Sequence, residues 1–410
     1  MRFTPSRWFT LCFLVVALAL SSSCNESPVD KTPSPKPSAP PSPQPSPPPE
    51  GVAPVPVTPS VSALAPDDPL PGMLPVLDPH DIYSETRPDK LSPVVQSFPT
   101  RLYVPNSISD TVDVIDPTTY QILESFPVGA EPQHVVPSYD MKTLWVLNNQ
   151  GDSLTQIDPS TGKKGETIPV EDPYNLYYTP DGKYVLVVAE RLRRLDFRDP
   201  QTMRLQYSLA VPCRGVNHLD YTASGRYLIA SCEFSNELIK VDVGERKVLG
   251  RLPLPRRRGQ PQDVRLSPDG QVFYVADMRA HGVYLIDGES FTVLDFLPTG
   301  KGAHGLNISR DSKVLYVSNR GEGSISVIDF ATRKVVNKWR FPGGGSPDMG
   351  GLSVDGKILW LGGRYHHEVY AIDTTTGHLL ARIKVGKGPH GVCIYPQPGR
   401  YSLGHTGNLR

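Results

Sequence analysis

Short runs of hydrophobic residues recur along the chain from about residue 93, and a polar turn follows each of them. Examples are "LYVPN" (102–106), "LWVLN" (144–148), "FYVAD" (273–277), "LYVSN" (315–319) and "LWLGG" (359–363). Runs of this length, rich in aromatic and β-branched side chains, predict β-strands. Turns such as "TPDGK" (179–183) and "SPDGQ" (267–271) separate them, and their glycine suits the positive φ of a hairpin turn. We therefore expect an all-β fold of short antiparallel strands.

These strands fall into repeated units, each marked by an apolar residue followed by aspartate. The markers are Asp116, Asp158, Asp199, Asp242, Asp287, Asp329 and Asp373, at intervals of 42, 41, 43, 45, 42 and 44 residues. Four strands in a repeat of this length form one blade of a propeller, because such a sheet buries its faces only against neighbouring blades. Seven markers predict a single seven-bladed β-propeller over residues 86–410. The aspartates themselves are expected to cap turns through backbone hydrogen bonds.

The repeat also resembles a known family. The segment "LYVSNRGEGSISVIDFATRKVV" (315–336) is similar to the YVTN family of β-propeller repeats, and the resemblance covers residues 93–398. It implies a propeller fold and an exported or surface protein, but no particular activity, because one fold hosts many unrelated sites. The segment "GPHGVCIYP" (388–396) reads as an innermost strand that closes the ring, and "SPVVQSF" (92–98) competes for that place.

The first 23 residues differ from the repeats in composition. A basic start precedes the apolar stretch Trp8–Leu20, and serines then lead to Cys24, so residues 1–23 are expected to be an export signal peptide. Thirteen apolar residues are too few to span ~30 Å of hydrocarbon as a helix. The ending "LSSSC" resembles the lipobox of bacterial lipoproteins, although Leu20 stands one step further from the cysteine than that pattern prefers. The resemblance implies lipidation of Cys24, and plain secretion is the alternative.

Residues 24–85 are expected to be a disordered linker rich in proline and serine. Ten of the twenty residues in 31–50 are proline, a composition that builds no core and favours extended polyproline II. At about 3.1 Å per residue, this tether holds a domain on the order of 100 Å or more from a membrane. We therefore expect a membrane-anchored lipoprotein on the outer side of the cytoplasmic membrane or in the periplasm or cell envelope.

Charge and cysteine content narrow the function classes. Lysine plus arginine and aspartate plus glutamate each total 42, so the composition predicts no nucleic-acid partner. Cys213 and Cys232 flank one predicted hairpin, which leaves open either a disulfide or two buried thiols. The sequence contains no G-x-S-x-G, H-E-x-x-H, phosphate-loop or C-x-x-C-H motif, which disfavours motif-defined hydrolases and c-type cytochromes.

Loops that lead into the innermost strands and out of the second strands gather at one mouth of a propeller channel, where ligands usually bind. Counted back from the end of each innermost strand, one row holds His134, Asn175, His218, Asp263, Gly305, Met349 and Gly391. The row one residue earlier holds Gln133, Tyr174, Asn217, Gln262, His304, Asp348 and His390. The loops after the second strands add Glu190, Glu233, Asp277, Arg320, Arg364, Tyr365, His366 and His367. Because neighbours along a strand point to opposite sides, the sequence leaves open whether the two rows of histidines converge or diverge.

The candidate ligand-binding residues at this mouth are His134, Asn175, His218, Asp263, His304, Met349, His390, Glu190, Glu233, Arg320 and Arg364. Imidazole, carboxylate and thioether groups are ligands of transition metals, so His134, His218, His304 and His390 are candidate metal ligands. Two other interpretations stay open. The mouth could bind a polar ligand without metal, or the histidine–glycine pairs could serve only the tight turn into the strand.

Three functions fit these observations. The leading hypothesis is a monomeric, non-enzymatic exported propeller that presents its channel mouth to a small polar ligand or a cell-envelope protein. The alternative is a metal- or cofactor-binding, oxidoreductase-like propeller, by likeness to the propellers of nitrous-oxide reductase and haem-dependent nitrite reductase, where axial histidines hold metal or cofactor. A lactonase is the least favoured, since its calcium cage would have to come from Asp263, Asn175 and Glu190.

Overall fold

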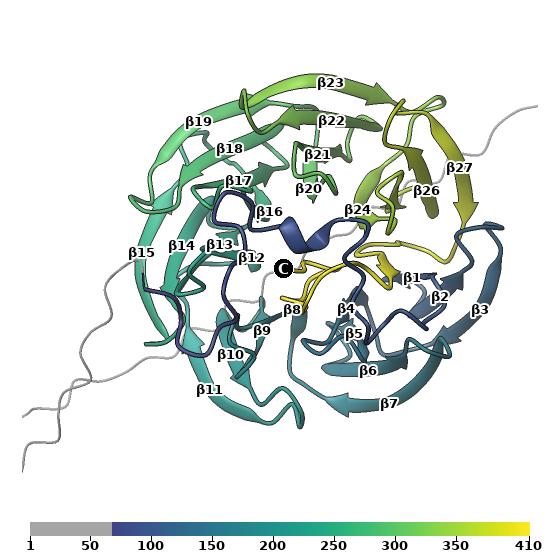
Figure 1. Cartoon of the computed structure of the whole chain (residues 1–410), viewed down its shortest axis with the longest axis horizontal. Coiled ribbons are helices and arrows are strands. Elements are labelled where there is room, and N and C mark those ends of the chain that lie inside the picture. The colour runs from purple at the N-terminus through teal and green to yellow at the C-terminus, as the bar shows by residue number, and fades with distance from the viewer. Residues whose placement is uncertain (1–67) are drawn as a thin grey trace, which may run out of the picture. The chain divides into compact units, whose positions relative to one another are not determined.

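Seven four-stranded antiparallel sheets surround a central channel in the computed structural model, which describes residues 68–410 (Figure 1). The predicted all-β, seven-bladed propeller is thereby confirmed. The predicted signal peptide, Cys24 and most of the proline-rich linker lie outside the described residues. No helix in the described part of the chain is long and apolar enough to cross a membrane.

The strands of each blade run from the channel outwards in chain order, except that the last strand of the chain is the innermost strand of blade 1. Blade 1 contains β28 (Cys393–Tyr395), β1 (Arg101–Asn106), β2 (Thr111–Ile115) and β3 (Ile122–Pro127). Blade 2 contains β4 (Pro132–Pro137), β5 (Leu144–Asn148), β6 (Ser153–Asp158) and β7 (Lys163–Pro169). Blade 3 contains β8 (Pro173–Tyr178), β9 (Val185–Ala189), β10 (Arg194–Arg198) and β11 (Leu205–Ala210).

The remaining four blades follow the same order. Blade 4 contains β12 (Val216–Tyr221), β13 (Tyr227–Cys232), β14 (Glu237–Asp242) and β15 (Lys247–Pro253). Blade 5 contains β16 (Pro261–Leu266), β17 (Val272–Asp277), β18 (Gly282–Asp287) and β19 (Val293–Pro298). Blade 6 contains β20 (Ala303–Ile308), β21 (Val314–Asn319), β22 (Ser324–Asp329) and β23 (Lys334–Arg340). Blade 7 contains β24 (Pro347–Leu352), β25 (Ile358–Gly363), β26 (Glu368–Asp373) and β27 (Leu379–Lys384).

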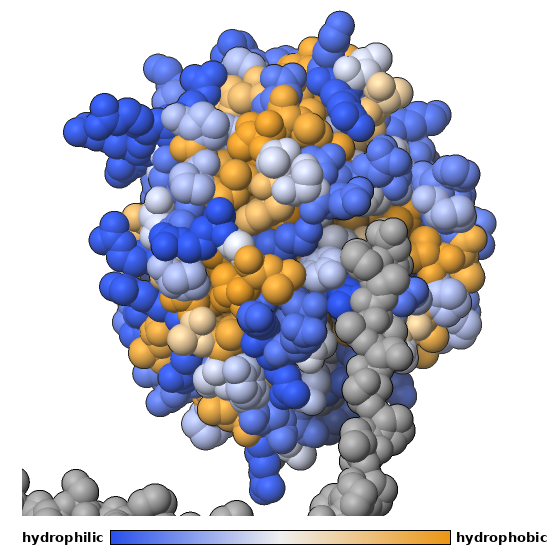
Figure 2. All heavy atoms as spheres, turned by 90° about the vertical axis from the view of Figure 1, so that its left-hand side faces the viewer, coloured by the Kyte–Doolittle hydropathy of each residue, from blue (hydrophilic) through white to orange (hydrophobic). Residues whose placement is uncertain are grey.

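Burial decreases from the channel to the rim. The inner strands bury both faces between neighbouring blades, which is why they read as nearly continuous apolar runs. Trp360 of blade 7, for example, lies in one cluster with Leu102 and Val104 of blade 1. The outermost strands are largely exposed, and the side of the ring formed by β11, β15 and β19 carries hydrophilic residues with apolar patches between them (Figure 2). The core is therefore a set of interfaces between blades.

The C-terminal strand closes the ring. β28 pairs with β1, with Leu102 opposite Ile394, so the segment 388–396 completes blade 1 as the sequence indicates. The competing segment, 92–98, forms turns and not a strand. The marker aspartates cap turns as predicted: the amide N–H of Thr118 donates to Asp116 Oδ1 at 2.8 Å, and that of Thr202 to Asp199 Oδ1 at 2.7 Å.

An N-terminal segment packs across one face of the ring and places the start of the folded part earlier than predicted. Residues 68–85 were expected to be linker, but Leu70, Ile82 and Tyr83 are buried against the propeller. The Tyr83 hydroxyl donates to Leu266 O at 2.8 Å, just before the short 3-10 helix η1 (Ser84–Thr86), which crosses the ring centre (Figure 1). The few apolar residues that anchor this segment do not stand out in a proline-rich sequence. Their burial against the blades holds the segment in place.

A C-terminal hairpin enters the channel from the same face. After β28, the chain turns and forms a bridge between Ser402 and Leu409, and it lies at the ring centre in Figure 1. Backbone hydrogen bonds tie it to blades 2 and 3, because Ser402 N–H donates to Tyr139 O at 3.1 Å and Tyr178 N–H donates to Leu403 O at 3.0 Å. At its base, the Arg410 guanidinium lies 3.2 Å from the buried Asp220 carboxylate. We refer to residues 396–410 as the C-terminal hairpin.

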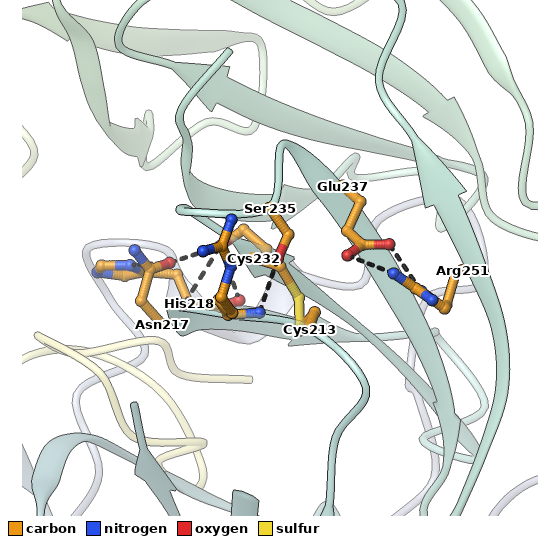
Figure 3. The surroundings of a disulfide bond; sticks show 9 residues. Cys213, Asn217, His218, Cys232, Ser235, Glu237 and Arg251 are labelled. Carbon is orange, nitrogen blue, oxygen red and sulfur yellow. Dashed lines mark hydrogen bonds and ion pairs between the residues drawn. A yellow bond between two sulfur atoms is a disulfide. The ribbon is translucent and has the colours of Figure 1, made fainter. Parts of the chain in front are cut away.

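Cys213 and Cys232 form a disulfide between the loop before β12 and the end of β13, with Cα atoms 6.0 Å apart. Figure 3 shows it with Asn217 and His218 on its channel side and the Glu237–Arg251 ion pair, 2.8 Å, on its outer side. Cys393 is a buried free thiol whose pKa is raised by burial, so it is unreactive in the folded protein. The disulfide fastens the blade that supplies His218.

Candidate functional site

A β-bulge near the start of six of the seven innermost strands, all except β28, decides which side chains reach the channel. In β12, Val216 pairs with Cys232 and Leu219 with Ala230, so Asn217 and His218 together oppose a single residue of β13. Bulges with one extra residue also interrupt β4, β8, β16, β20 and β24. A bulge turns two successive side chains towards one side. The bulges therefore turn His134, His218 and His304, which come from both rows, towards the channel, a point that the sequence left open.

The four histidines singled out from the sequence come together, and His405 of the C-terminal hairpin joins them. Ring centroids lie 4.8 Å apart for His134 and His390, 5.3 Å for His134 and His405, and 5.5 Å for His134 and His218. They lie 5.1 Å apart for His218 and His405, 5.7 Å for His304 and His390, and 6.4 Å for His218 and His304. All five side chains are buried. We call these five residues the histidine cluster.

In two imidazoles of the cluster, one ring nitrogen is hydrogen-bonded to an oxygen, and the second ring nitrogen has no partner among the described residues. His134 Nδ1 lies 3.0 Å from Tyr174 O, and His218 Nδ1 lies 3.1 Å from Asn217 Oδ1. Both oxygens only accept, so both Nδ1 atoms carry the proton and both Nε2 atoms carry a lone pair. Each Nε2 is buried and has no hydrogen-bond partner. This is the arrangement that orients histidine ligands of metals.

His405 completes a first group of three imidazoles. One ring nitrogen from each of His134, His218 and His405 lies within 4.8 Å of the others. Asn175 Nδ2 lies 3.1 Å from His405 Nδ1, and Asp263 Oδ1 lies 3.4 Å from His405 Nε2, so these two predicted site residues position the third imidazole. Burial would raise the pKa of Asp263, but Arg265 and His405 hold it well below its usual range.

His304, Asp348 and His390 form a second group of the same kind. His304 Nδ1 lies 2.8 Å from Asp348 Oδ1, and His390 Nε2 lies 3.7 Å from Asp348 Oδ2. Arg320 Nη1 lies 3.2 Å from the same carboxylate. Burial would raise the pKa of Asp348, but Arg320 and the two histidines hold it well below its usual range. This carboxylate is already neutralised by a cation, so the second group is an ion-pair network.

The imidazoles of His134, His218 and His390 stay neutral. Burial lowers the pKa of all three well below the usual value, and neighbouring side chains lower it further: the His405 imidazole beside His134 and His218, and the Arg364 guanidinium beside His390. Neutral imidazole is the form that binds metal ions.

The loops after the second strands of blades 3, 4, 6 and 7 form the rim above the cluster. The Tyr174 ring packs edge-on against His134 and His218, with centroids 5.6 and 5.7 Å away, and covers them. Asn217 Nδ2 donates to Glu233 Oε2 at 2.9 Å, which links the rim to His218. Burial and the neighbouring Glu233 raise the pKa of Glu190 to about 8. Glu190 is therefore a protonated carboxyl group at neutral pH.

Replacing Glu190 by glutamine is expected to remove a pH dependence of stability. Between the ordinary Glu pKa of about 4.5 and the folded value of about 8, the native protein keeps a proton that the unfolded chain has released. Stability therefore falls as pH rises through this window, by about 1 kcal/mol or more for this partly buried group. Urea unfolding at pH 5 and pH 8.5 measures the drop, which Glu190→Gln should lack and the exposed control Glu166→Gln should retain. An equal drop in both variants would refute the assignment.

Other predicted residues serve the scaffold. Met349 is buried in β24, and among the described residues no hydrogen bond or ring contact ties its sulfur to the cluster. Asp277 accepts from the backbone N–H groups of Gln260 and Ala280 at 2.8 Å and so caps its own turn. His366 Nδ1 lies 2.9 Å from Ser346 Oγ, and Gly388 N–H donates to His367 Nδ1 at 3.1 Å. These histidines fasten loops at the edge of the mouth.

The three side chains that a lactonase-type calcium cage would need are engaged in other contacts. Asp263 accepts from the N–H groups of Val264 and Leu306 at 2.9 Å, and it lies beside Arg265 and His405. Asn175 Oδ1 accepts from Leu176 N–H at 2.8 Å. Glu190 is a protonated acid, whereas a calcium ligand is an ionised carboxylate. These side chains do not offer the set of free oxygens that calcium takes.

Sequence reasoning missed His405. It stands outside the repeats, after the last strand, and no register connects it to the other four histidines. Gly404 and Gly407, both with positive φ, let the hairpin turn sharply at the point that carries it. Only the insertion of the hairpin into the channel reveals its place in the cluster.

Fold and site together define a seven-bladed β-propeller whose channel holds a cluster of five buried histidines. Residues 67–400 match the family described as YNCE-like beta-propeller, and the chain belongs to that family. It is 23% identical over 345 residues to "Antigen Lp49" of Leptospira interrogans serogroup Icterohaemorrhagiae serovar copenhageni, covering 74% of this chain and 72% of that protein. It is 25% identical over 272 residues to "Uncharacterized protein YncE" of Salmonella typhi, covering 60% of this chain and 73% of that protein.

Solved structures share the fold at low identity. "Kuenenia stuttgartiensis Hydrazine Synthase" aligns with a TM-score of 0.58 and 18% identity, covering 69% of this chain and 95% of that chain. "Dihydro-heme d1 dehydrogenase NirN in complex with DHE" aligns with a TM-score of 0.57 and 16% identity, covering 73% and 75%. At this identity the likeness shows the fold alone.

Proposed function

We propose that this propeller is a metal-binding protein that holds one transition-metal ion in its channel through His134, His218 and His405. The observation that carries the proposal is the pair of buried Nε2 atoms of His134 and His218, which have no hydrogen-bond partner. An unpartnered buried lone pair costs free energy, and a metal ion would relieve two of them at once. Imidazole donors suit copper, zinc or nickel, and copper(II) binds most tightly among these.

The second group is the weaker candidate for the metal. His304, Asp348 and His390 share their site with the guanidinium group of Arg320, whose positive charge repels a metal cation. In the first group the Asp263 carboxylate lies 3.4 Å from His405, and its own guanidinium partner, Arg265, lies further from it, at 3.8 Å, than Arg320 lies from Asp348. The proposal therefore assigns metal binding to the first group and leaves the second group the role of holding the mouth together.

We propose a binding role and no reaction. Two solved neighbours are named as a synthase and a dehydrogenase, but their likeness to this chain is one of fold. The mouth retains the predicted polar lining of Glu190, Glu233, Arg320 and Arg364, which supports recognition of a small polar ligand or a cell-envelope protein at the same place. Partner binding without metal is the second candidate, and it is favoured if the histidine cluster holds no ion.

The proposed location rests on the sequence. A signal peptide, Cys24 in a lipobox-like context and a proline-rich tether support an exported, lipid-anchored protein of the cell envelope. Expression of the full chain with Cys24→Ser, followed by separation of membranes, tests the anchor. The unaltered protein should sediment with membranes and the variant should not, and a variant that stays with membranes excludes lipidation as the anchor.

Metal content of the tag-free protein tests the metal site. After removal of metal with a chelator, the folded protein should take up one equivalent of copper(II) or zinc, measured by mass spectrometry of metals after gel filtration. Cobalt(II) should give visible absorption bands typical of nitrogen ligation. A native-like preparation that takes up no stoichiometric metal refutes the proposal and leaves metal-free ligand binding.

A further inference from the structure

Two arginines stand at equivalent positions of neighbouring blades on the rim of the mouth. Arg320 follows β21 of blade 6, and Arg364 follows β25 of blade 7. Both are at least partly buried, which is uncommon for arginine without a counter-charge. The hydrogen-bond partners of these two guanidinium groups show whether the rim has donors left for a ligand.

Two nitrogens of the Arg320 guanidinium group, Nη1 and Nη2, have protein partners that hold the side chain in place. Nη1 lies 3.2 and 3.3 Å from the two oxygens of Asp348, and Nη2 lies 2.8 Å from the Met278 sulfur. Its guanidinium also lies 5.4 Å from the centre of the Tyr365 ring. Nε is buried and has no hydrogen-bond partner. Arg320 is thus a fixed donor whose Nε–H is still available.

Arg364 has no hydrogen-bond acceptor in the described part of the chain. Among residues 68–410, no hydrogen bond or ion pair involves its guanidinium group, and its Nη1 atom is buried. Arg364 is close enough to His390 to act on it. After burial, the charge of Arg364 is the largest effect that lowers the pKa of that imidazole. A buried guanidinium nitrogen without an acceptor is a costly arrangement that an anion would satisfy.

Arg320 and His390 share one carboxylate on the rim, because Asp348 Oδ2 lies 3.2 Å from Arg320 Nη1 and 3.7 Å from His390 Nε2. The pKa of the Tyr174 hydroxyl is raised mainly by burial, and the charged side chains that act on it are Glu190, Glu233, Arg364 and Arg320. Two further buried atoms of the mouth, Glu190 Oε1 and His390 Nδ1, have no hydrogen-bond partner. With Glu190 protonated, the carboxyl group, the imidazole and both guanidinium groups can all donate hydrogen bonds. A set of hydrogen-bond donors of this kind fits a ligand whose atoms accept hydrogen bonds.

We propose that Arg364 and Arg320, with Glu190 and His390, bind a small carboxylate-type anion at the channel mouth. The guanidinium fork matches a pair of carboxylate oxygens, which is why arginine serves this recognition better than lysine. The ligand is small because Tyr174 and the histidine cluster fill the channel below the rim, and His390 itself is only 2% exposed. The inference deepens the proposed function by naming a ligand class for the same mouth, but the anion contacts do not require the metal.

Acetate binding by the chelator-treated, tag-free protein tests the anion site. Saturation-transfer NMR with acetate in a chloride- and phosphate-free buffer should detect binding, and competition by formate should displace it. Arg364→Met keeps the length of the side chain but removes its charge and donors, and it should weaken acetate binding at least about tenfold. Arg340→Met, on the outermost strand with 69% of its side chain exposed, is the matched control and should bind like the unaltered protein.

Each outcome is decisive, and metal uptake is measured on the same samples. Loss of acetate binding in Arg364→Met with unchanged metal uptake supports the anion site. Equal binding by Arg364→Met and Arg340→Met, or no binding by the folded unaltered protein, overturns it. Binding that occurs only after metal loading also overturns it, since the anion would then be a ligand of the metal. Failure of metal uptake alone refutes the proposed function and leaves the anion site standing.

Discussion

Alanine at His134 or His218 is expected to abolish stoichiometric metal binding. Each substitution removes one of the two unpartnered, correctly oriented Nε2 atoms, and the affinity should fall at least about 100-fold, because even residues that only orient metal ligands contribute about 10- to 100-fold. His405→Ala should lower the affinity less, since both of its ring nitrogens already have partners in the protein. Competition titrations against a metal indicator measure all three variants.

Two controls separate this site from the rest of the protein. His378→Ala removes an exposed histidine at the outer edge of blade 7 and should leave the affinity unchanged. His304→Ala removes a member of the second group and should change the affinity only a few-fold. If His304→Ala loses the metal while His134→Ala retains it, the second group holds the ion and the assignment is wrong. Thermal unfolding in the presence of chelator shows which variants remain folded.

Alanine at Asp220 is expected to cause the largest loss of stability among the substitutions considered. The buried carboxylate lies 3.2 Å from Arg410 and also accepts from Asn408 Nδ2 at 3.2 Å and Leu266 N–H at 2.9 Å. Its removal leaves the buried guanidinium group of Arg410 without its counter-charge, which costs about 3–5 kcal/mol. Urea unfolding measures this loss, and the exposed-carboxylate variant Glu166→Ala should stay within about 0.5 kcal/mol of the unaltered protein.

The same substitution should loosen the C-terminal hairpin and weaken metal binding, because the hairpin carries His405. Limited proteolysis should cleave Asp220→Ala near residues 396–410 sooner than the unaltered protein. A variant of full stability with an uncleaved hairpin would show that Asp220 does not hold the hairpin in the channel.

The repeated phrase around His304 and His390 has a structural cause that also serves the site. A Cβ atom on Gly391 would stand 2.2 Å from His134 Cδ2, and one on Gly305 would stand 2.6 Å from Asp348 O. Glycine after each histidine is therefore required for the close approach of the next blade. The sequence left open tight packing and channel chemistry as interpretations of this phrase, and the two do not exclude each other. The glycines serve the packing, and the histidines before them belong to the histidine cluster.

Local information was enough for the fold. Strand runs, hairpin turns and aspartate caps each depend on a few neighbouring residues, and their spacing of 41 to 45 residues determined blades, blade number and ring closure. The apolar anchors Leu70, Ile82 and Tyr83 escaped notice because they are isolated in a proline-rich stretch. The same register also located the channel mouth and four of its histidines.

Only the tertiary structure decided how those histidines face. Alternation along a strand left open whether neighbouring positions converge or diverge. Bulges in β4, β12 and β20 turn His134, His218 and His304 inwards, and a bulge shows only in the pairing of two strands. His405 reaches the cluster through a hairpin that packs against blades remote in sequence, and no periodicity relates it to them. The sequence by itself thus determined a seven-bladed propeller with histidines at one mouth. Their convergence depends on long-range packing, which no local pattern records.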